Sequence, residues 1–210
     1  MKELINEKTI PELICKKILK IVGQTKVISD LEKKKLSYYI CALYVNTTKI
    51  MILLAIALIL KVFWEVIIMW CFFALIRRTA FGIHSSSSFN CTIVTVLIFA
   101  GGGLISKYVN FPIHIYFILN FISFVVYVIY APADTESRPL VGKKMRKKFK
   151  NKTILTFIVL FLLVTILNIY QIKILFAISA FAEAISILPI TYRIFKRRYK
   201  NYEYFKENRK

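Results

Sequence analysis

Two side chains near the middle of the sequence could do nucleophilic chemistry together. His84 is one of only two histidines among the 210 residues, and Cys91 follows it by seven positions, where a long apolar run begins. A thiol becomes a nucleophile when a nearby base takes its proton, and a neutral imidazole is such a base. The pair therefore predicts a thiol enzyme, provided that the residues between them let the two side chains meet.

The residues between the histidine and the cysteine predict a loop. Ser85 to Asn90 are all polar except Phe89, and they include four consecutive serines, which are poor helix formers. In one continuous helix His84 and Cys91 would stand ~10 Å apart along the axis, at about 1.5 Å per residue. That distance is too long for proton transfer. We therefore expect the chain to fold back here, helped by Gly82.

Cys91 lies where a helix is expected to begin, with Ser88 or Asn90 as its cap. The positive end of a helix dipole and a neighbouring histidine both favour the thiolate over the thiol. The free backbone N–H groups of the same turn could also stabilise the oxyanion of an attacked carbonyl. These residues alone leave a second interpretation open, in which the cysteine only packs and the histidine is solvated. No cysteine or histidine spacing matches a metal site, so neither a metal nor another cofactor is expected.

The composition places this chemistry in a membrane. Hydrophobic residues make up 58% of the chain and aromatic residues 15%, whereas an average globular chain is about 45–50% apolar. Several apolar runs approach the ~20 residues that a helix needs to cross the hydrocarbon. The runs cover residues 39–60, 62–76, 91–106, 111–130, 153–170 and 174–190. The predicted fold is all-α, one polytopic integral membrane domain over residues 1–210 with about six transmembrane helices.

An amphipathic helix is expected ahead of the first run, within residues 1–36. Its apolar side chains fall on one helical stripe, with lysines off that stripe. The stripe consists of Ile10, Leu13, Ile14, Ile18, Ile21 and Val22. Such a helix lies in the headgroup layer with its lysines near lipid phosphates. Packing of this helix against the body of the protein is the open alternative.

The net charge of +20 predicts a topology and a class of partner. Of the 31 lysines and arginines, 27 lie in four segments that share one side if all six runs cross: residues 1–38, 77–90, 131–152 and 191–210. This bias places both termini, the basic connector at 131–152, the basic tail and the loop in the cytoplasm. Short basic connectors are typical of membrane topology and not of nucleic-acid binding. Anionic lipid or an acidic peptide is therefore the expected partner, and nucleic acid is not.

The first two apolar runs allow two interpretations. A tight hairpin near Lys61 separates them in the first. A single helix over residues 50–76 replaces them in the second, with Lys61 and Glu65 one turn apart and able to pair. The single helix buries both charges near the bilayer centre, at a few kcal/mol each. The hairpin is therefore preferred.

Glu183 is the only acidic residue of the last apolar run. An intramembrane carboxylate is a functional candidate by default, while pairing with Lys49 or Lys61 is an equally open interpretation. In the connector, Asp134 and Glu136 are candidates for orienting the histidine as a third catalytic member.

Residues 77–91 resemble the core motif of the accessory gene regulator B (AgrB) family, bacterial membrane endopeptidases that process quorum-sensing propeptides. The shared pattern is an arginine, then a glycine, then the histidine, with the cysteine seven positions on. Ile83 stands where many members carry a second glycine, and Ser85 where alanine is common. Both departures concern the shape of the loop and not the nucleophile. The connector at residues 130–139, with the basic run after it, is also similar to that of the family.

The resemblance implies a cysteine endopeptidase with Cys91 as nucleophile and His84 as general base and then acid. Cys91 would release the C-terminal tail of a small propeptide and hold the rest as a thioester. An internal cysteine or serine of the substrate would then close a thiolactone or lactone ring. The resemblance assigns Arg77 and Gly82 to substrate binding or to ordering of the loop.

The resemblance also implies partners and a location. The substrate is expected to have an amphipathic leader and an acidic tail, and the enzyme is expected to be a homodimer in a bacterial cell membrane. A small peptide exporter and a membrane scaffold without catalysis are the competing functions.

Overall fold

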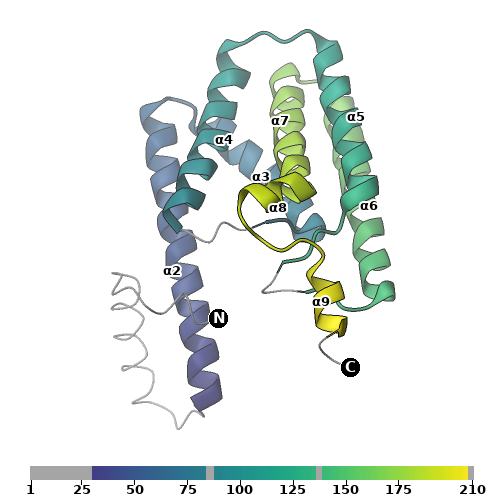
Figure 1. The fold of residues 1–210 in the computed structure, drawn as a ribbon. Coiled ribbons are helices and arrows are strands. Elements are labelled where there is room, and N and C mark those ends of the chain that lie inside the picture. The colour runs from purple at the N-terminus through teal and green to yellow at the C-terminus, as the bar shows by residue number, and fades with distance from the viewer. Residues whose placement is uncertain (1–29, 84–87, 136–138, 208–210) are drawn as a thin grey trace. The chain divides into compact units, whose positions relative to one another are not determined.

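The computed structural model describes residues 30–83, 88–135 and 139–207 (Figure 1). The regular elements in this part of the chain are helices: α2 (Asp30–Ile59), α3 (Phe63–Ala80), α4 (Ser88–Tyr108), α5 (Ile113–Tyr130), α6 (Lys143–Leu167), α7 (Tyr170–Ile187), α8 (Pro189–Ile194) and α9 (Asn201–Glu207). The predicted all-α fold class is therefore confirmed. The chain forms two compact units, Met1–Ile52 and Leu53–Lys210, and the candidate site lies in the second.

Four helices of the second unit are long and apolar enough to cross a membrane. They span Phe89–Tyr108, Ile113–Tyr130, Lys143–Leu167 and Tyr170–Ile187. Helix α3 has 18 residues but carries Glu65, Arg77 and Arg78, and the apolar part of α2 is limited to Asn46–Ile59. The helices thus fit a membrane protein, while the count of six spans stays a prediction.

A turn separates α2 from α3. Helix α2 ends at Ile59 and α3 begins at Phe63, with Lys61 between them in a left-handed conformation (φ 57°). The amide of Val62 donates to the carbonyl of Ala57 at 2.9 Å and so closes the turn. The predicted turn near Lys61 is confirmed, and the alternative single helix over residues 50–76 is wrong.

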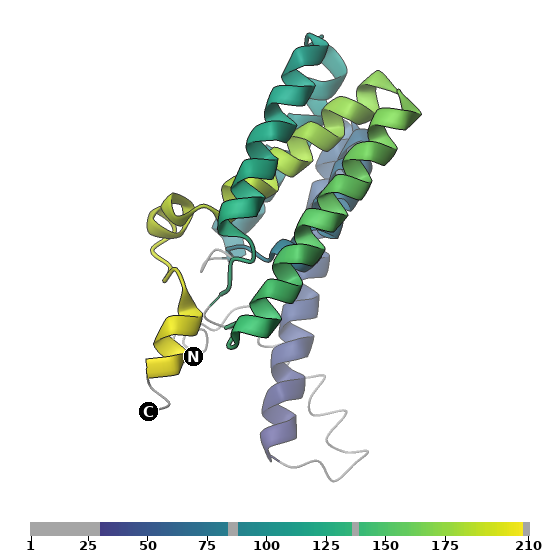
Figure 2. The ribbon, with the colours of Figure 1, turned by 90° about the vertical axis from the view of Figure 1, so that its right-hand side faces the viewer.

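Helix α7 is the central helix of the second unit. It packs against α3, α4, α5 and α6, which surround it in the two ribbon views (Figures 1 and 2). Inside the protein, 56% of its span is buried, against 17%, 22% and 28% for the other three spans. The central position shields the polar Lys173, Ser179 and Glu183 from lipid, where an unpaired charge would be costly.

A glycine allows the close packing of α4 on its neighbours. A Cβ atom on Gly102 would lie 2.7 Å from Cε of Met69 on α3 and 3.2 Å from Cγ2 of Ile178 on α7. A larger residue would therefore require the side chain of Met69 to shift. Small residues at helix interfaces allow such a close approach of neighbouring helices in membrane proteins.

The connectors of the second unit alternate between its two ends. At one end, the amide of Gly82 donates to the carbonyl of Ala133, and the hydroxyl of Tyr192 donates to the carbonyl of Asp134. At the other end, the hydroxyl of Tyr170 donates to the carbonyl of Phe111 at 2.8 Å. The basic segments around 77–83, 139–152 and 191–207 thus share one end. The membrane side that this end faces stays a prediction.

Candidate functional site

The chain leaves helix α3 just after its last basic turn. The helix ends at Ala80, and the next two residues have positive φ angles, 62° at Phe81 and 128° at Gly82. Glycine adopts the second of these angles without a steric penalty. The ring of Phe81 packs edge-on against Phe149 at 5.0 Å between ring centroids. The helix therefore stops before the serine run, as predicted, whereas residues 88–90 at the end of the predicted loop already belong to α4.

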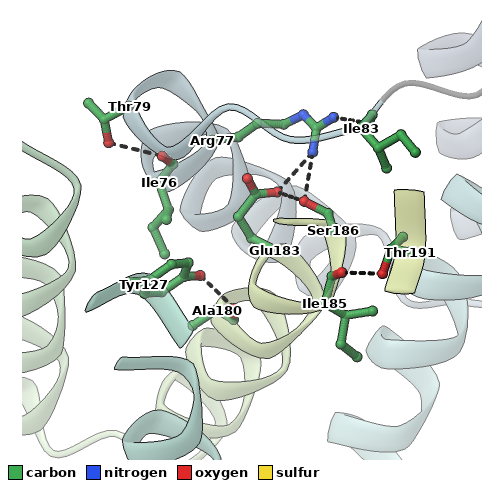
Figure 3. A network of polar contacts seen from close by, with 10 residues as sticks. All are labelled: Ile76, Arg77, Thr79, Ile83, Tyr127, Ala180, Glu183, Ile185, Ser186 and Thr191. Atoms are coloured by element: carbon green, nitrogen blue, oxygen red, sulfur yellow. Dashed lines mark hydrogen bonds and ion pairs between the residues drawn. The ribbon is translucent and has the colours of Figure 1, made fainter. Parts of the chain in front are cut away.

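The guanidinium of Arg77 joins this turn to helix α7 (Figure 3). Its Nη2 donates to the carbonyl of Ile83 at 2.6 Å, while its Nη1 donates to Oε2 of Glu183 at 2.9 Å and to Oγ of Ser186 at 3.2 Å. The hydroxyl of Ser186 also donates to Oε2 of Glu183, at 2.9 Å. These four residues, Arg77, Ile83, Glu183 and Ser186, are called the Arg77 clamp below. The clamp fixes the backbone directly before His84 to the central helix.

The carboxylate of Glu183 is the buried anchor of the clamp. Its side chain has no exposed surface, and that of Arg77 is 20% exposed. A carboxylate in such surroundings is tolerated only when paired, because an unpaired charge in a low-dielectric interior is very costly. The hypothesis that Glu183 pairs with Lys49 or Lys61 is wrong, since its cationic partner is Arg77. Its second oxygen, Oε1, has no hydrogen-bond partner in the part of the chain that the structure describes.

Gly82 fits against the clamp only because it has no side chain. A Cβ atom there would lie 2.5 Å from Oγ of Ser186, 3.0 Å from Nη1 of Arg77 and 3.4 Å from Oε1 of Glu183. The flanking backbone is held as well, since the amide of Gly82 donates to Ala133 at 3.1 Å and that of Ile83 donates to Ser186 at 3.4 Å. The structure therefore brings together the predicted residues Arg77 and Gly82.

Asp134 holds the connector in place and is fully engaged. Its Oδ2 accepts the amides of Tyr202 at 2.7 Å and Leu140 at 3.4 Å, and its Oδ1 accepts the amide of Asn201 at 3.2 Å. Burial raises the pKa of this carboxyl group, and the three backbone hydrogen bonds oppose that rise. Its hydrogen bonds tie the connector to α9. Orientation of the histidine by Asp134 stays a prediction, because His84 lies outside the described residues. Glu136 lies outside the described residues.

Cys91 lies in the first turn of α4. The helix begins at Ser88, so Cys91 is its fourth residue and Asn90 is inside the helix instead of capping it. The cysteine is a free thiol of intermediate exposure, and its carbonyl accepts the hydroxyl of Thr95 at 2.7 Å. This is the predicted position near a helix start. His84 lies outside the described residues, so the meeting of thiol and imidazole stays a prediction.

Comparison with known proteins identifies the family. The accessory gene regulator B family matches residues 15–187 of the chain. This chain belongs to the accessory gene regulator B family. An AgrB-like protein of Clostridium acetobutylicum is 36% identical over 182 residues, which cover 85% of each chain. The AgrB-like protein of Listeria innocua is 31% identical over 171 residues, 80% of this chain and 83% of its relative.

A named regulator is also similar. The accessory gene regulator protein B of Staphylococcus aureus, strain Newman, is 35% identical over 147 residues, which cover 69% of this chain and 76% of that protein. No solved structure matches the chain. The resemblance of residues 77–91 to the AgrB motif is thus part of a similarity that extends over most of the sequence.

The AgrB-type motif alone did not reveal what anchors its arginine. Glu183 was noticed as an isolated intramembrane carboxylate, but its partner was not predicted, because Arg77 lies 106 positions away in the sequence. Ser186 was missed. The usable signal was the spacing of three residues between Glu183 and Ser186, which puts both on one face of α7.

Proposed function

We propose that this AgrB family member is a membrane cysteine endopeptidase that trims a small signalling propeptide and forms a thioester with the remaining peptide. The observation that carries the proposal is the Arg77 clamp. It fixes Ile83, the residue covalently joined to His84, at the end of the bundle where α4 begins with Cys91 in its first turn. A base and a nucleophile that must meet benefit from such a fixed backbone on one side.

The proposed reaction begins at the thiol of Cys91. His84 takes its proton, and the sulfur attacks the carbonyl carbon of a peptide bond near the C-terminus of the substrate. His84 then gives the proton to the departing amine, so the C–N bond breaks as the tail leaves. The N-terminal part of the substrate remains as an acyl thioester on Cys91.

The second half of the reaction regenerates the enzyme. A cysteine within the bound peptide attacks the thioester carbonyl and closes a thiolactone ring, while the sulfur of Cys91 leaves and regains a proton. A substrate serine would give a lactone by the same route. A thioester is exchanged for a thioester in the first case, so the step is close to balanced in free energy and needs no cofactor.

The charge around this end of the bundle supports an acidic tail as the leaving fragment. Exposed basic side chains gather on the first turns of α6, the last turn of α8 and the segment after α8. They are Lys143, Lys144, Lys147, Lys148, Arg193, Lys196, Arg198 and Lys200. Such a field attracts an acidic peptide by simple electrostatics. The same residues favour the cytoplasmic side, where positive connectors accumulate and anionic headgroups are available.

Co-expression with a propeptide tests the proposal. The substrate to use is a short peptide encoded in a neighbouring reading frame, with an amphipathic start, a central cysteine or serine and an acidic end. Cys91→Ala and His84→Ala should each abolish release of the tail at an unchanged level in the membrane. Cys71→Ala is the matched control, because Cys71 is an exposed free cysteine on α3, and it should cleave normally.

Two results would contradict the proposal. Normal tail release by Cys91→Ala would exclude a thioester enzyme. A defect in peptide transport with intact cleavage in both variants would instead support the exporter.

A further inference from the structure

Glu183 on α7 is the most deeply buried of the acidic side chains that the structure describes. Glu183 is the only one of them with no exposed surface. A buried ion pair is usually no more stabilising than well-packed apolar side chains of the same volume. The rest of α7 is held mainly by apolar packing and by neutral contacts such as the hydroxyl of Ser179 on the carbonyl of Met69. The buried ammonium of Lys173, near the other end of the helix, donates to Oδ1 of Asn168. The presence of a fully buried carboxylate at this position therefore calls for a local explanation.

We propose that Glu183 is a positioning residue for the peptidase reaction, which through Arg77 sets the place of the backbone that carries His84. The inference rests on the proposed function and names a residue outside the motif of residues 77–91. Glu183 itself need not touch the substrate.

The two terminal nitrogens of the Arg77 guanidinium bind different partners, and this arrangement supports the role. Nη2 of Arg77 holds the carbonyl of Ile83 at 2.6 Å, and Nη1 holds Oε2 of Glu183 at 2.9 Å. A planar guanidinium holds these two donors in a fixed geometry. Fixing the position of Nη1 therefore also fixes the direction in which Nη2 donates. Without the carboxylate, Nη1 would keep only its hydrogen bond to Ser186. The nitrogen Nη2, which binds the carbonyl of Ile83, would then be held less firmly relative to α7.

The turn itself is shaped around this anchor. Gly82 leaves room for Oε1 of Glu183, 3.4 Å from the place where its Cβ would stand, and Ser186 both donates to Oε2 and accepts the amide of Ile83 on its carbonyl. Two residues of α7, Glu183 and Ser186, thus lie against the turn at residues 81–83. A shift of about 1 Å in a catalytic group is enough to lower a rate by about two orders of magnitude, so the position of this turn matters for the residue that follows it.

The test is a double-mutant cycle on the purified full-length chain in lipid vesicles with the propeptide. Glu183→Gln keeps the shape and removes the charge. It should lower kcat about tenfold or more, the rate equivalent of one charge-assisted hydrogen bond, and leave KM within about twofold. Arg77→Gln should lower kcat at least as much. In the Arg77→Gln background, Glu183→Gln should cause no further loss, because the carboxylate acts only through the guanidinium.

Two controls separate positioning from general support of the fold. Ser179→Ala removes another buried hydroxyl of α7 that the clamp does not use, and it should keep the wild-type kcat. Ser186→Ala removes one of the two acceptors of Nη1, and it should lower kcat about threefold at unchanged KM; it also carries the test if Glu183→Gln fails to fold.

The outcomes are distinct from those of the proposed function. If Cys91→Ala is inactive but Glu183→Gln, or Ser186→Ala where the former does not fold, has the kcat of wild type, the positioning role is wrong and the peptidase stands. The role is also wrong if Glu183→Gln lowers kcat by the same factor in both backgrounds. If Cys91→Ala cleaves normally, the proposed function fails first.

Discussion

Two pairs of opposite charges lie at opposite ends of the helical bundle, and they are built differently. At the clamp end, Arg77 and Glu183 are 2.9 Å apart, with the carboxylate fully buried. At the other end, Lys107 and Glu65 are 4.0 Å apart, with side chains 34% and 13% exposed. A close buried pair is strongly destabilising to break, whereas a loose exposed pair contributes little. The tight pair is found where the family motif lies.

The end that carries Lys107 relies on contacts that are easier to replace. The hydroxyl of Tyr170 bonds both the amide and the carbonyl of Phe111, and the ammonium of Lys107 donates to the backbone carbonyl of Lys61. These contacts close turns between helices and hold no segment next to a motif residue. We therefore expect changes at this end to alter stability without altering cleavage.

The largest expected difference between the two ends follows from removing each carboxylate. Glu183→Ala leaves Arg77 without its buried anion and should lower the free energy of unfolding by about 3–5 kcal/mol. Glu65→Ala removes the carboxylate of a loose pair whose partner Lys107 is partly exposed, and it should cost about 1 kcal/mol or less. Thermal unfolding in detergent measures both. Equal losses would mean that burial does not distinguish the two pairs.

A pair of glycine substitutions sharpens the same contrast at the level of the turn. Gly82→Ala forces an alanine to a φ of 128°, with a Cβ 2.5 Å from Oγ of Ser186. It should cost about 1–3 kcal/mol and most of the cleavage activity. Gly101→Ala is the matched control, because a Cβ there meets nothing within 4 Å. A normal turnover rate in Gly82→Ala would show that the turn tolerates displacement.

A tyrosine substitution at the other end should separate stability from activity. Tyr170→Phe removes the hydroxyl that bridges the amide and carbonyl of Phe111. The loss should be about 1 kcal/mol, typical of a net hydrogen bond, with tail release unchanged. Peptide cleavage and melting temperature measured on the same preparation check this. A loss of cleavage would show that the two ends are coupled.

The smallest expected effect is a dependence on pH at the clamp end. Burial raises the pKa of Asp134 above its ordinary value of 3.8. The folded chain therefore holds this proton more tightly than the unfolded chain does. The stabilising contribution is complete below pH 3.8 and is lost as the pH rises through the raised pKa.

Asp134→Asn should abolish this loss of stability with rising pH, as followed by unfolding at a series of pH values. Glu203 gives an internal control of opposite sign, because the hydroxyl of Tyr202 lowers the pKa of its carboxyl group. Its contribution is lost as the pH falls through the lowered pKa, and Glu203→Gln should remove that loss. If the loss of stability with rising pH persists in Asp134→Asn, another group causes it.

The amino-acid sequence predicted the helical class and the turn at Lys61, because both depend on local signals. Apolar run lengths and the cost of burying Lys61 and Glu65 were enough for these two features. The helix start near Cys91 was also readable from the polar residues before it. Helix ends were less accurate, since α6 begins at Lys143, ten residues before its apolar run, where basic side chains continue the helix outside the span.

The sequence predicted only some of the residues of the candidate site. Arg77 and Gly82 came from a motif, which lies within fifteen consecutive residues. Their partners Glu183 and Ser186 lie on a helix more than a hundred residues later, so no spacing rule joins them. The hydrogen bonds that the carboxylate of Asp134 accepts could not be predicted from the sequence either, because their donors are backbone amides of α9 and of Leu140.

Trapping the acyl group on Cys91 tests the central claim most directly. The enzyme is incubated with a propeptide whose internal cysteine and serines are replaced by alanine, so that the ring cannot close, and is then digested and analysed by mass spectrometry. The account predicts an adduct on the fragment containing Cys91, with the mass of the N-terminal part of the substrate less one water, released by hydroxylamine and absent in His84→Ala. Release of the tail from this substrate with Cys91 unmodified at every time point would contradict the account.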